Sequence, residues 1–503
     1  MMVAQAEHFS KIKREEAGRS RLRLYAAALF SLTFLVPFIL VTFDYSFRKF
    51  FLALVLVDVC LYPLFRYLSQ EESGIPVLPL LCIAYAAQFA LPIFTREPIF
   101  PIAYDEIALT EAQVEMALLM AIAGVVVLQA AFYLSRTKRI ANALPVARLM
   151  LNQRKAEIFC LIIFVASFIQ KPIQSLFTEV EIARFSSIFN LLNNQILVAI
   201  GILAWIVYSG RGTRWHKALL YLVVGITMVR GSSTTMMETM LVPVVVLFTT
   251  KWMYTKRLPV LGFILIAGII LFLSPVKHEV RATAGVDVVM EKETSSSERA
   301  WQWTSQAAEF WIESFSGERT FSESASDLTL RTDLIHQFSY IYSATPSIVP
   351  FQNGSSYQYF AVALIPRIVW PEKPEVNSTN NFYALSYGIS TEQVIENSTF
   401  GVSLIGEGYM NFGFIGVLLA MAFQGLCLSL LEQIFGGPGS GSGGMAIFIA
   451  TFVFFLNGIG SSAEIMFGGI LQNLLCSCIL LWWAAERIQK QSPPGRSLKS
   501  LYR

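Results

Sequence analysis

The run Pro259-Val-Leu-Gly-Phe-Ile-Leu-Ile-Ala-Gly-Ile-Ile-Leu-Phe-Leu-Ser-Pro275 carries no charged residue, and a polar span from Val276 to Phe400 follows it directly. An apolar run of this length predicts a helix that crosses a lipid bilayer. The polar span is the one long polar stretch in a chain that otherwise consists mainly of apolar runs. The boundary at Val276 therefore predicts a bundle of membrane helices with one large loop on one side of the membrane.

The composition supports a membrane protein. Of the 503 residues, 54% are hydrophobic and 15% are charged, which exceeds the apolar share and falls below the charged share of soluble proteins. The net charge of +3 is too small to indicate binding of nucleic acid. All six cysteines lie in apolar runs, so we expect no disulfide framework in the loop and no cysteine metal site.

Apolar runs of spanning length recur along the chain. Each predicts an α-helix, because a helix satisfies its own backbone polar groups in lipid. The fold class expected is an all-α polytopic membrane protein with about twelve transmembrane helices and one large external loop. The predicted helices cover residues 24–43, 50–68, 75–94, 112–134, 157–175, 190–209, 218–231, 235–254, 259–275, 402–431, 445–462 and 465–485.

The basic residues predict the orientation. Lysine and arginine gather after the fourth, sixth and eighth predicted helices and in both terminal tails, which places these parts on the cytoplasmic side. The long loop then lies outside, and its eight Lys or Arg against fifteen Asp or Glu fit that side. The predicted organisation is a cytoplasmic tail over 1–23, helices over 24–275, the external loop over 276–401, helices over 402–485 and a cytoplasmic tail over 486–503.

Short amphipathic helices are expected inside the loop. Residues 300–315 place tryptophan and phenylalanine at three- to four-residue steps, which predicts a helix lying in the headgroup region or packed on the bundle. Residues 328–342 can also form a helix, with Arg331, Asp333 and His336 within two turns. Residues 357–370 are apolar but too short to cross the membrane, and they predict a segment that dips into its edge.

Cations on the external side are candidates for binding a diphosphate. An arginine guanidinium makes bidentate hydrogen bonds to phosphate oxygens and stays protonated. The alternative for a single arginine is a salt bridge with an acid of the loop, or an anchor at the membrane interface. The candidates for pyrophosphate binding are Arg281, Arg331, Arg367, Lys373 and Arg230.

Carboxylates and histidines on the same side are candidates for a general base that removes a proton from a hydroxyl. Glu407 enters the membrane between two glycines, and Asp333 is the competing carboxylate. His336 is a further candidate, although a lone histidine is more often a surface or packing residue. The sequence has no GxxxxGK[ST] loop and no HExxH motif, so coupling to ATP and a zinc centre of that kind are not expected.

Three stretches carry a resemblance to a known family. They are Ile365-Pro-Arg-Ile-Val-Trp-Pro-Glu-Lys-Pro374, Tyr342-Ser-Ala-Thr-Pro346 with Asn353-Gly-Ser-Ser-Tyr357, and Gly406-Glu-Gly-Tyr-Met-Asn-Phe-Gly413. With these stretches and its many helices, the chain resembles the bacterial oligosaccharide repeat-unit polymerases of the Wzy type. The arginine-to-glycine spacing described for some members is absent, because Ser378 stands eleven residues after Arg367.

The resemblance implies a metal-independent, inverting glycosyltransferase without a cofactor, in the bacterial inner membrane. It would join undecaprenyl-pyrophosphate-linked oligosaccharide units at the periplasmic face into O-antigen, capsule or exopolysaccharide. The lipid bilayer, a chain-length regulator and a flippase are the partners implied. Two alternatives stay open at this point: an O-antigen ligase that uses the same donor, and a transporter or flippase of lipid-linked sugars.

Overall fold

The computed structural model describes most of the chain between the two tails. The predicted first helix at 24–43 and both predicted tails lie outside the described residues. The described residues are 47–70, 75–95, 97–103, 105–134, 136–143, 150–174, 176–232, 237–255, 260–273, 275–276, 296–316, 333–363, 365, 370, 372, 377–395, 399–436 and 440–485.

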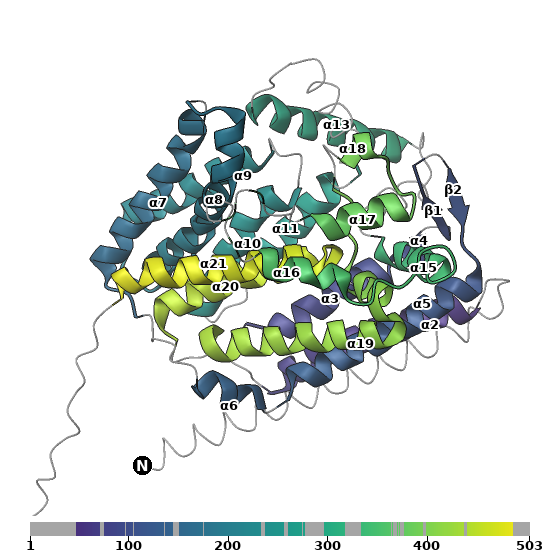
Figure 1. Cartoon of the computed structure of the whole chain (residues 1–503). Helices are drawn as coiled ribbons and strands as arrows, with labels where there is room; N and C mark the ends of the chain where they lie inside the picture. The colour runs from purple at the N-terminus through teal and green to yellow at the C-terminus, as the bar shows by residue number, and fades with distance from the viewer. Residues whose placement is uncertain are drawn as a thin grey trace, which may run out of the picture.

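Of the described residues, 82% are helical, and Figure 1 shows these helices with one small sheet. The helices of the first half are α2 (Phe47–Gln70), α3 (Val77–Phe89), α4 (Pro92–Thr95), α5 (Glu111–Phe132), α6 (Arg136–Ala143), α7 (Gln153–Gln174), α8 (Glu179–Tyr208), α9 (Arg214–Ser232), α10 (Met237–Thr255) and α11 (Val260–Leu273). Later helices are α13 (Ser296–Ser316), α15 (Leu334–Ala344), α16 (Gln358–Ala363), α17 (Ser378–Ser386), α18 (Glu392–Ile395), α19 (Leu404–Leu431), α20 (Gly441–Asn457) and α21 (Ala463–Ala484). The antiparallel strands are β1 (Ile99–Pro101) and β2 (Glu106–Ala108).

Seven of the described helical segments are long and apolar enough to cross a membrane. They are Phe47–Tyr67, Val77–Thr95, Glu111–Phe132, Ile188–Tyr208, Leu404–Gly436, Gly441–Gly460 and Ala463–Ala484. This confirms an all-α, multi-pass membrane protein. Helices also form at the other predicted segments between residues 157 and 275, but those in α10 and α11 are shorter apolar stretches. The number of twelve crossings stays a prediction.

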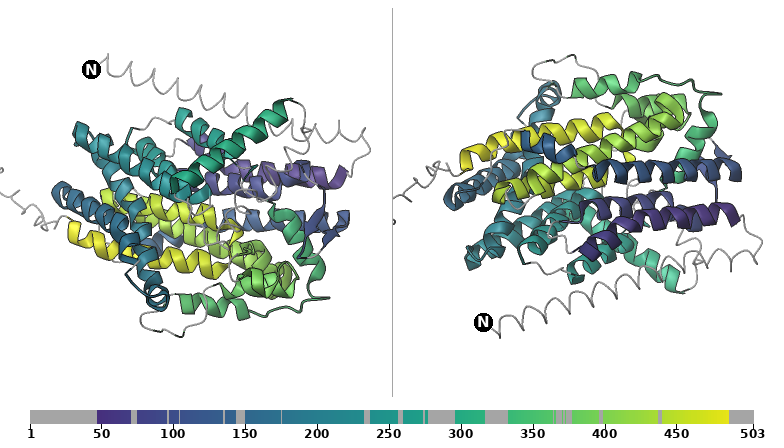
Figure 2. Two further views of the ribbon diagram at one scale, coloured as in Figure 1. Left: turned by 90° about the horizontal axis from the view of Figure 1, so that it is seen from above. Right: turned by 90° about the horizontal axis from the view of Figure 1, so that it is seen from below.

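The long helices run side by side along one direction (Figure 2), so their connections gather at two ends. At one end, Leu151 forms a β-bridge with Ala485, and Gln153 Nε2 donates to the Arg211 carbonyl. At the other end, the Ala103 amide between β1 and β2 donates to the Gly388 carbonyl after α17. The loops predicted to share a side thus meet one another. Which end faces the cytoplasm stays a prediction.

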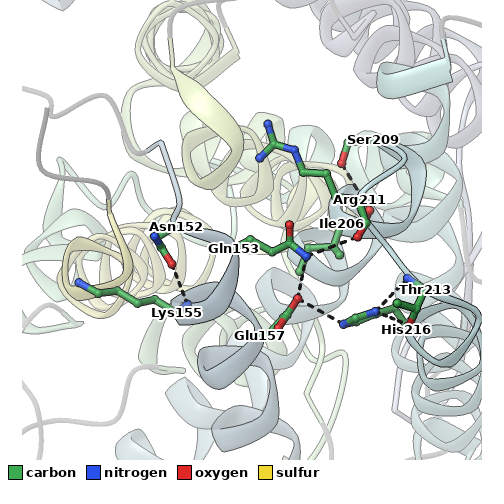
Figure 3. Close-up of polar contacts among 9 residues, drawn as sticks. All are labelled: Asn152, Gln153, Lys155, Glu157, Ile206, Ser209, Arg211, Thr213 and His216. Carbon is green, nitrogen blue, oxygen red and sulfur yellow. Dashed lines mark hydrogen bonds and ion pairs between the residues drawn. The ribbon is translucent and has the colours of Figure 1, made fainter.

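A polar cluster joins α7, α8 and α9 at the first of these ends (Figure 3). The Thr213 amide donates to Nδ1 of His216 at 3.0 Å, so the ring proton lies on Nε2. That Nε2 faces Glu157 Oε1 at 3.4 Å, and Gln153 Nε2 donates to the same oxygen at 2.9 Å. The cluster fixes the connection between α8 and α9 against the start of α7.

The predicted amphipathic helix at 300–315 is α13, and it packs against the bundle with one face. Trp303, Ala307 and Phe310 are buried against Leu273 and Val276. Trp301 and Phe315 are exposed on its other side. The face that carries Trp303 packs on the bundle, which is one of the two predicted positions. The exposed aromatic rings on the other side fit the second, a position at the membrane interface.

Helix α19 is interrupted near its start. Phe412 and Gly413 leave helical geometry, and Gly413 has a φ of 60°, which favours glycine. The short first part then packs against the long second part with backbone contact, because a Cβ on Gly416 would overlap the Gly408 carbonyl oxygen. Only glycine at these positions lets the two parts approach so closely.

We expect Gly416→Ala to destabilise the fold by about 1–3 kcal/mol, since the added methyl group must push two backbones apart. Gly469→Ala in α21 is the matched control, because a Cβ there meets nothing within 4 Å. Thermal unfolding of both purified variants in detergent measures the difference. Equal midpoints for the two variants would contradict the close packing at Gly408.

Candidate functional site

Glu407 is the central residue of a buried polar site at the start of α19. Its side chain is fully buried, with 0% exposure. Oε1 accepts a hydrogen bond from the Ser356 hydroxyl at 2.7 Å. Oε2 accepts from the backbone N–H of Ala463, in the first turn of α21, at 2.6 Å. The carboxylate therefore joins the loop before α16 to the start of a membrane helix.

Asn411 lies one turn after Glu407 and holds the same loop. Its Nδ2 donates to the Ser356 hydroxyl at 2.8 Å and to the Glu407 carbonyl at 2.9 Å, while Oδ1 accepts from the Gly354 amide at 2.9 Å. Asn353 and Gly354 both have positive φ, at 49° and 89°. This turn is why an asparagine-glycine pair stands here.

Glu464 is a second buried carboxylate beside the first. It follows Ala463, the residue that binds Glu407, and its own exposure is 1%. Its Oε1 accepts from the Thr379 amide at 2.9 Å, in the first turn of α17. We name the six residues that make up this site, which are Ser356, Thr379, Glu407, Asn411, Ser462 and Glu464, the polar junction.

Both carboxylates occupy helix N-termini. Glu407 binds the amide end of α21, and Glu464 binds the amide end of α17. Unsatisfied N–H groups and the helix dipole favour negative charge at such ends. Because both Glu407 oxygens already accept hydrogen bonds, the geometry suits Glu407 to holding elements together more than to taking a proton from a substrate.

Asp333 and His336 form a separate buried pair at the start of α15. Asp333 is the N-cap of this helix, and its Oδ1 accepts from the His336 amide at 3.1 Å. Its Oδ2 lies 2.7 Å from His336 Nδ1, and because a carboxylate accepts, Nδ1 carries the proton. Among the described residues, none forms a hydrogen bond with Nε2. The pair is thus a buried imidazole oriented by a carboxylate, and its second nitrogen forms no hydrogen bond with the described residues.

Residues 328–332 of the helix predicted at 328–342 lie outside the described residues, and α15 begins at Leu334. Asp333 is a cap of α15 and not an interior residue, since its side chain accepts from the free His336 amide. Arg331 lies outside the described residues. Asp333 and His336 do come together as expected.

Aromatic contacts fix α15 against its neighbours. The Phe338 and Tyr409 rings meet edge to face at 5.9 Å, which packs α15 on α19. Tyr340 stacks on Phe100 of β1, and its hydroxyl donates to the Tyr387 carbonyl at 2.8 Å. Burial raises the pKa of Tyr387 to about 12, so its hydroxyl stays neutral beside that of Thr345. The histidine pair is held in a rigid setting.

The structure describes one of the five cations predicted to bind pyrophosphate. Arg281, Arg331, Arg367 and Lys373 lie outside the described residues. Arg230 is described, and its Nη1 donates to the Ser167 carbonyl at 2.9 Å and to the Ser167 hydroxyl at 3.2 Å. These two contacts join α9 to α7, and neither of them involves the polar junction.

Sequence reasoning found Glu407, Asp333 and His336 but assigned no role to Glu464 and did not consider Ser356, Thr379 or Ser462. One local signal existed, because Ser461-Ser-Ala-Glu464 matches the pattern that starts a helix with a capping box. In the structure, Glu464 instead reaches across to the Thr379 amide, 85 residues away in sequence. Local patterns do not contain that partner.

Fold and site together define a class, which is an all-α multi-pass membrane protein with a buried carboxylate pair at the starts of α19 and α21. The chain belongs to the family described as Domain of unknown function (DUF8712), whose model matches residues 142–489. This range contains the polar junction and the Asp333–His336 pair. No curated protein and no solved structure matches the chain.

Proposed function

We propose that the protein is a glycosyltransferase that joins lipid-pyrophosphate-linked oligosaccharide units into a surface polysaccharide. The observation that carries this proposal is the 2.7 Å contact between Asp333 Oδ2 and His336 Nδ1. A carboxylate that orients an imidazole in this way is a common arrangement for a general base. The resemblance of residues 365–374 and 406–413 to the repeat-unit polymerases supplies the substrate class.

The proposed reaction is a single displacement. Nε2 of His336 removes the proton from the acceptor sugar hydroxyl, and the hydroxyl oxygen attacks the anomeric carbon of the donor. The bond from that carbon to the pyrophosphate oxygen breaks, and the pyrophosphate leaves on its lipid. One displacement inverts the anomeric centre. Asp333 keeps the proton on Nδ1 and stabilises the imidazolium that forms.

The leaving pyrophosphate needs positive charge at the moment the bond breaks. Arg281, Arg331, Arg367 and Lys373 belong to the same loop sequence as the histidine pair and are proposed to supply it. Arg230 is left out, because its guanidinium is engaged between α9 and α7. Glu407 is proposed to hold the loop on the bundle, since both of its oxygens are occupied.

Reconstitution tests the proposal. Purified protein is incubated with a synthetic undecaprenyl-pyrophosphate-linked repeat unit, without nucleotide, and the products are separated by size. We expect a ladder of longer lipid-linked chains and release of undecaprenyl pyrophosphate. Arg367→Ala should abolish the ladder, and an exposed acid replaced on α18, Glu392→Gln, is the control.

Two outcomes would overturn the proposal. Transfer to a lipid A core acceptor without chain growth would identify a ligase. Movement of the lipid-linked unit across a vesicle membrane without any new glycosidic bond would identify a transporter.

A further inference from the structure

Three oxygen atoms in the polar junction are buried without a hydrogen-bond partner in the described part of the chain. They are Oε2 of Glu464, Oγ1 of Thr379 and Oγ of Ser462. The exposures of these residues are 1%, 1% and 0%. Buried polar atoms are nearly always satisfied, so three such atoms together indicate an occupant that is not part of the protein.

Two of these atoms, the hydroxyl oxygens of Thr379 and Ser462, lie beside the carboxyl group that carries the third. The Thr379 amide donates to Glu464 Oε1, which brings the start of α17 onto Glu464. The hydroxyls of Thr379 and Ser462 lie beside the same carboxyl group, yet neither meets the geometry of a hydrogen bond to it. Both hydroxyls are thus near the Glu464 carboxyl group without a well-formed hydrogen bond to it.

The charge of the site decides whether its occupant is an ion or a water molecule. Glu464 lies next to the Glu407 carboxylate, and among the described residues no lysine or arginine is paired with either. A buried carboxylate without a cationic partner is costly beyond what a helix N-terminus offsets, and proteins meet that cost by pairing it, by binding a metal ion or by keeping the group protonated. A water molecule would satisfy the hydroxyls and leave the charge uncompensated.

The donor set points to the kind of ion. Carboxylate and hydroxyl oxygens are hard ligands that suit alkali and alkaline-earth cations and not zinc or copper. One carboxylate with two neutral hydroxyls has a formal charge of −1, which a monovalent cation balances. Both oxygens of Glu407 accept hydrogen bonds from Ser356 and Ala463, so Glu407 offers the ion no free ligand and is not counted in this charge.

We propose that Glu464, Thr379 and Ser462 form a binding site for a small monovalent cation, with sodium as its ion. The ion would connect the first turn of α17, in the loop, to the first turn of α21, in the bundle. Its role is to hold the loop in place, so the site goes beyond the proposed transfer reaction and takes no part in that reaction.

Thermal unfolding of the full chain in detergent tests the site. Midpoints are measured in sodium, potassium and N-methylglucamine chloride at one pH and one ionic strength. We expect a rise of a few degrees that saturates with sodium concentration, because a ligand that binds only the folded state stabilises it. Potassium should give less and N-methylglucamine none.

Three variants locate the ion. Glu464→Gln, Thr379→Val and Ser462→Ala should each remove the sodium-dependent rise, whereas Glu392→Gln, which changes an exposed acid, should keep it. If the first three variants fail to fold, binding of radioactive sodium to the wild-type protein, with potassium as competitor, still decides.

Several results would overturn the site. They are equal midpoints in all three salts, a rise produced by calcium or magnesium alone, a sodium-dependent rise that survives Glu464→Gln, and the absence of saturable sodium binding. An insensitive midpoint would indicate that Glu464 holds a proton instead. None of these results affects the reconstitution assay, so the two proposals can fail separately.

Discussion

His336→Ala is expected to lower the rate of chain elongation by about 10²–10⁴-fold, which is the usual contribution of a general base. The physical reason is the geometry of the pair, in which Asp333 holds the proton on Nδ1 and leaves Nε2 to accept one. Elongation is measured as the initial rate per mole of folded, purified protein. Thermal unfolding of the same sample shows whether the variant is folded.

Asp333→Asn separates the two roles of the aspartate. Asparagine caps a helix about as well as aspartate, so α15 should keep its start. An amide that presents its NH₂ to the ring would favour the wrong tautomer, and elongation should fall strongly with little change in the unfolding midpoint.

His216→Ala is the matched control for the histidine. His216 lies at the opposite end of the bundle, beside Glu157 (Figure 3). Its replacement should leave the elongation rate unchanged. Near-normal elongation by folded His336→Ala protein would mean that another group is the base.

Glu407→Ala is expected to have the largest effect on stability. The change removes the acceptor for the Ser356 hydroxyl and for the Ala463 amide and leaves both buried. Each unsatisfied buried donor costs about 1–3 kcal/mol, so we expect a loss of about 2–6 kcal/mol. The measurement is the fraction of folded protein against temperature or denaturant, with the exposed Glu106→Ala of β2 as control.

Glu407→Gln distinguishes a structural role from a chemical one. Its amide oxygen can accept from the Ala463 amide, and its NH₂ can donate to the Ser356 hydroxyl oxygen. We therefore expect a stable protein that still elongates. A folded Glu407→Gln variant without elongation would show that the carboxylate takes part in the reaction, and the assignment of His336 as sole base would then be wrong.

The helices could be predicted from sequence because their signal is local. An apolar run such as 402–431 needs no knowledge of distant residues to be recognised as a membrane helix. The break at Phe412 and Gly413 was not predicted, because glycines in an apolar helix are compatible with a straight one. Its cause is the packing of Gly408 on Gly416, which appears only in three dimensions.

Only the local part of the site could be predicted from the sequence. Asp333 and His336 are three residues apart, so their meeting follows from a helix start. Ser356 and Glu407 are 51 residues apart, and Ala463 lies 56 residues beyond Glu407. Such partners depend on how separate helices pack, and hydropathy carries no information about their pairing.

The bond between Glu407 and the Ala463 amide bears on biosynthesis. The ribosome makes α19 before α21, so a nascent chain that has inserted α19 holds a carboxylate that has its Ser356 partner and still lacks its Ala463 partner. Arrival of α21 provides the amide and completes the assembly. A nonsense mutation between the two helices would leave an unmatched acid in the membrane, which is the kind of defect that proteolytic quality control removes.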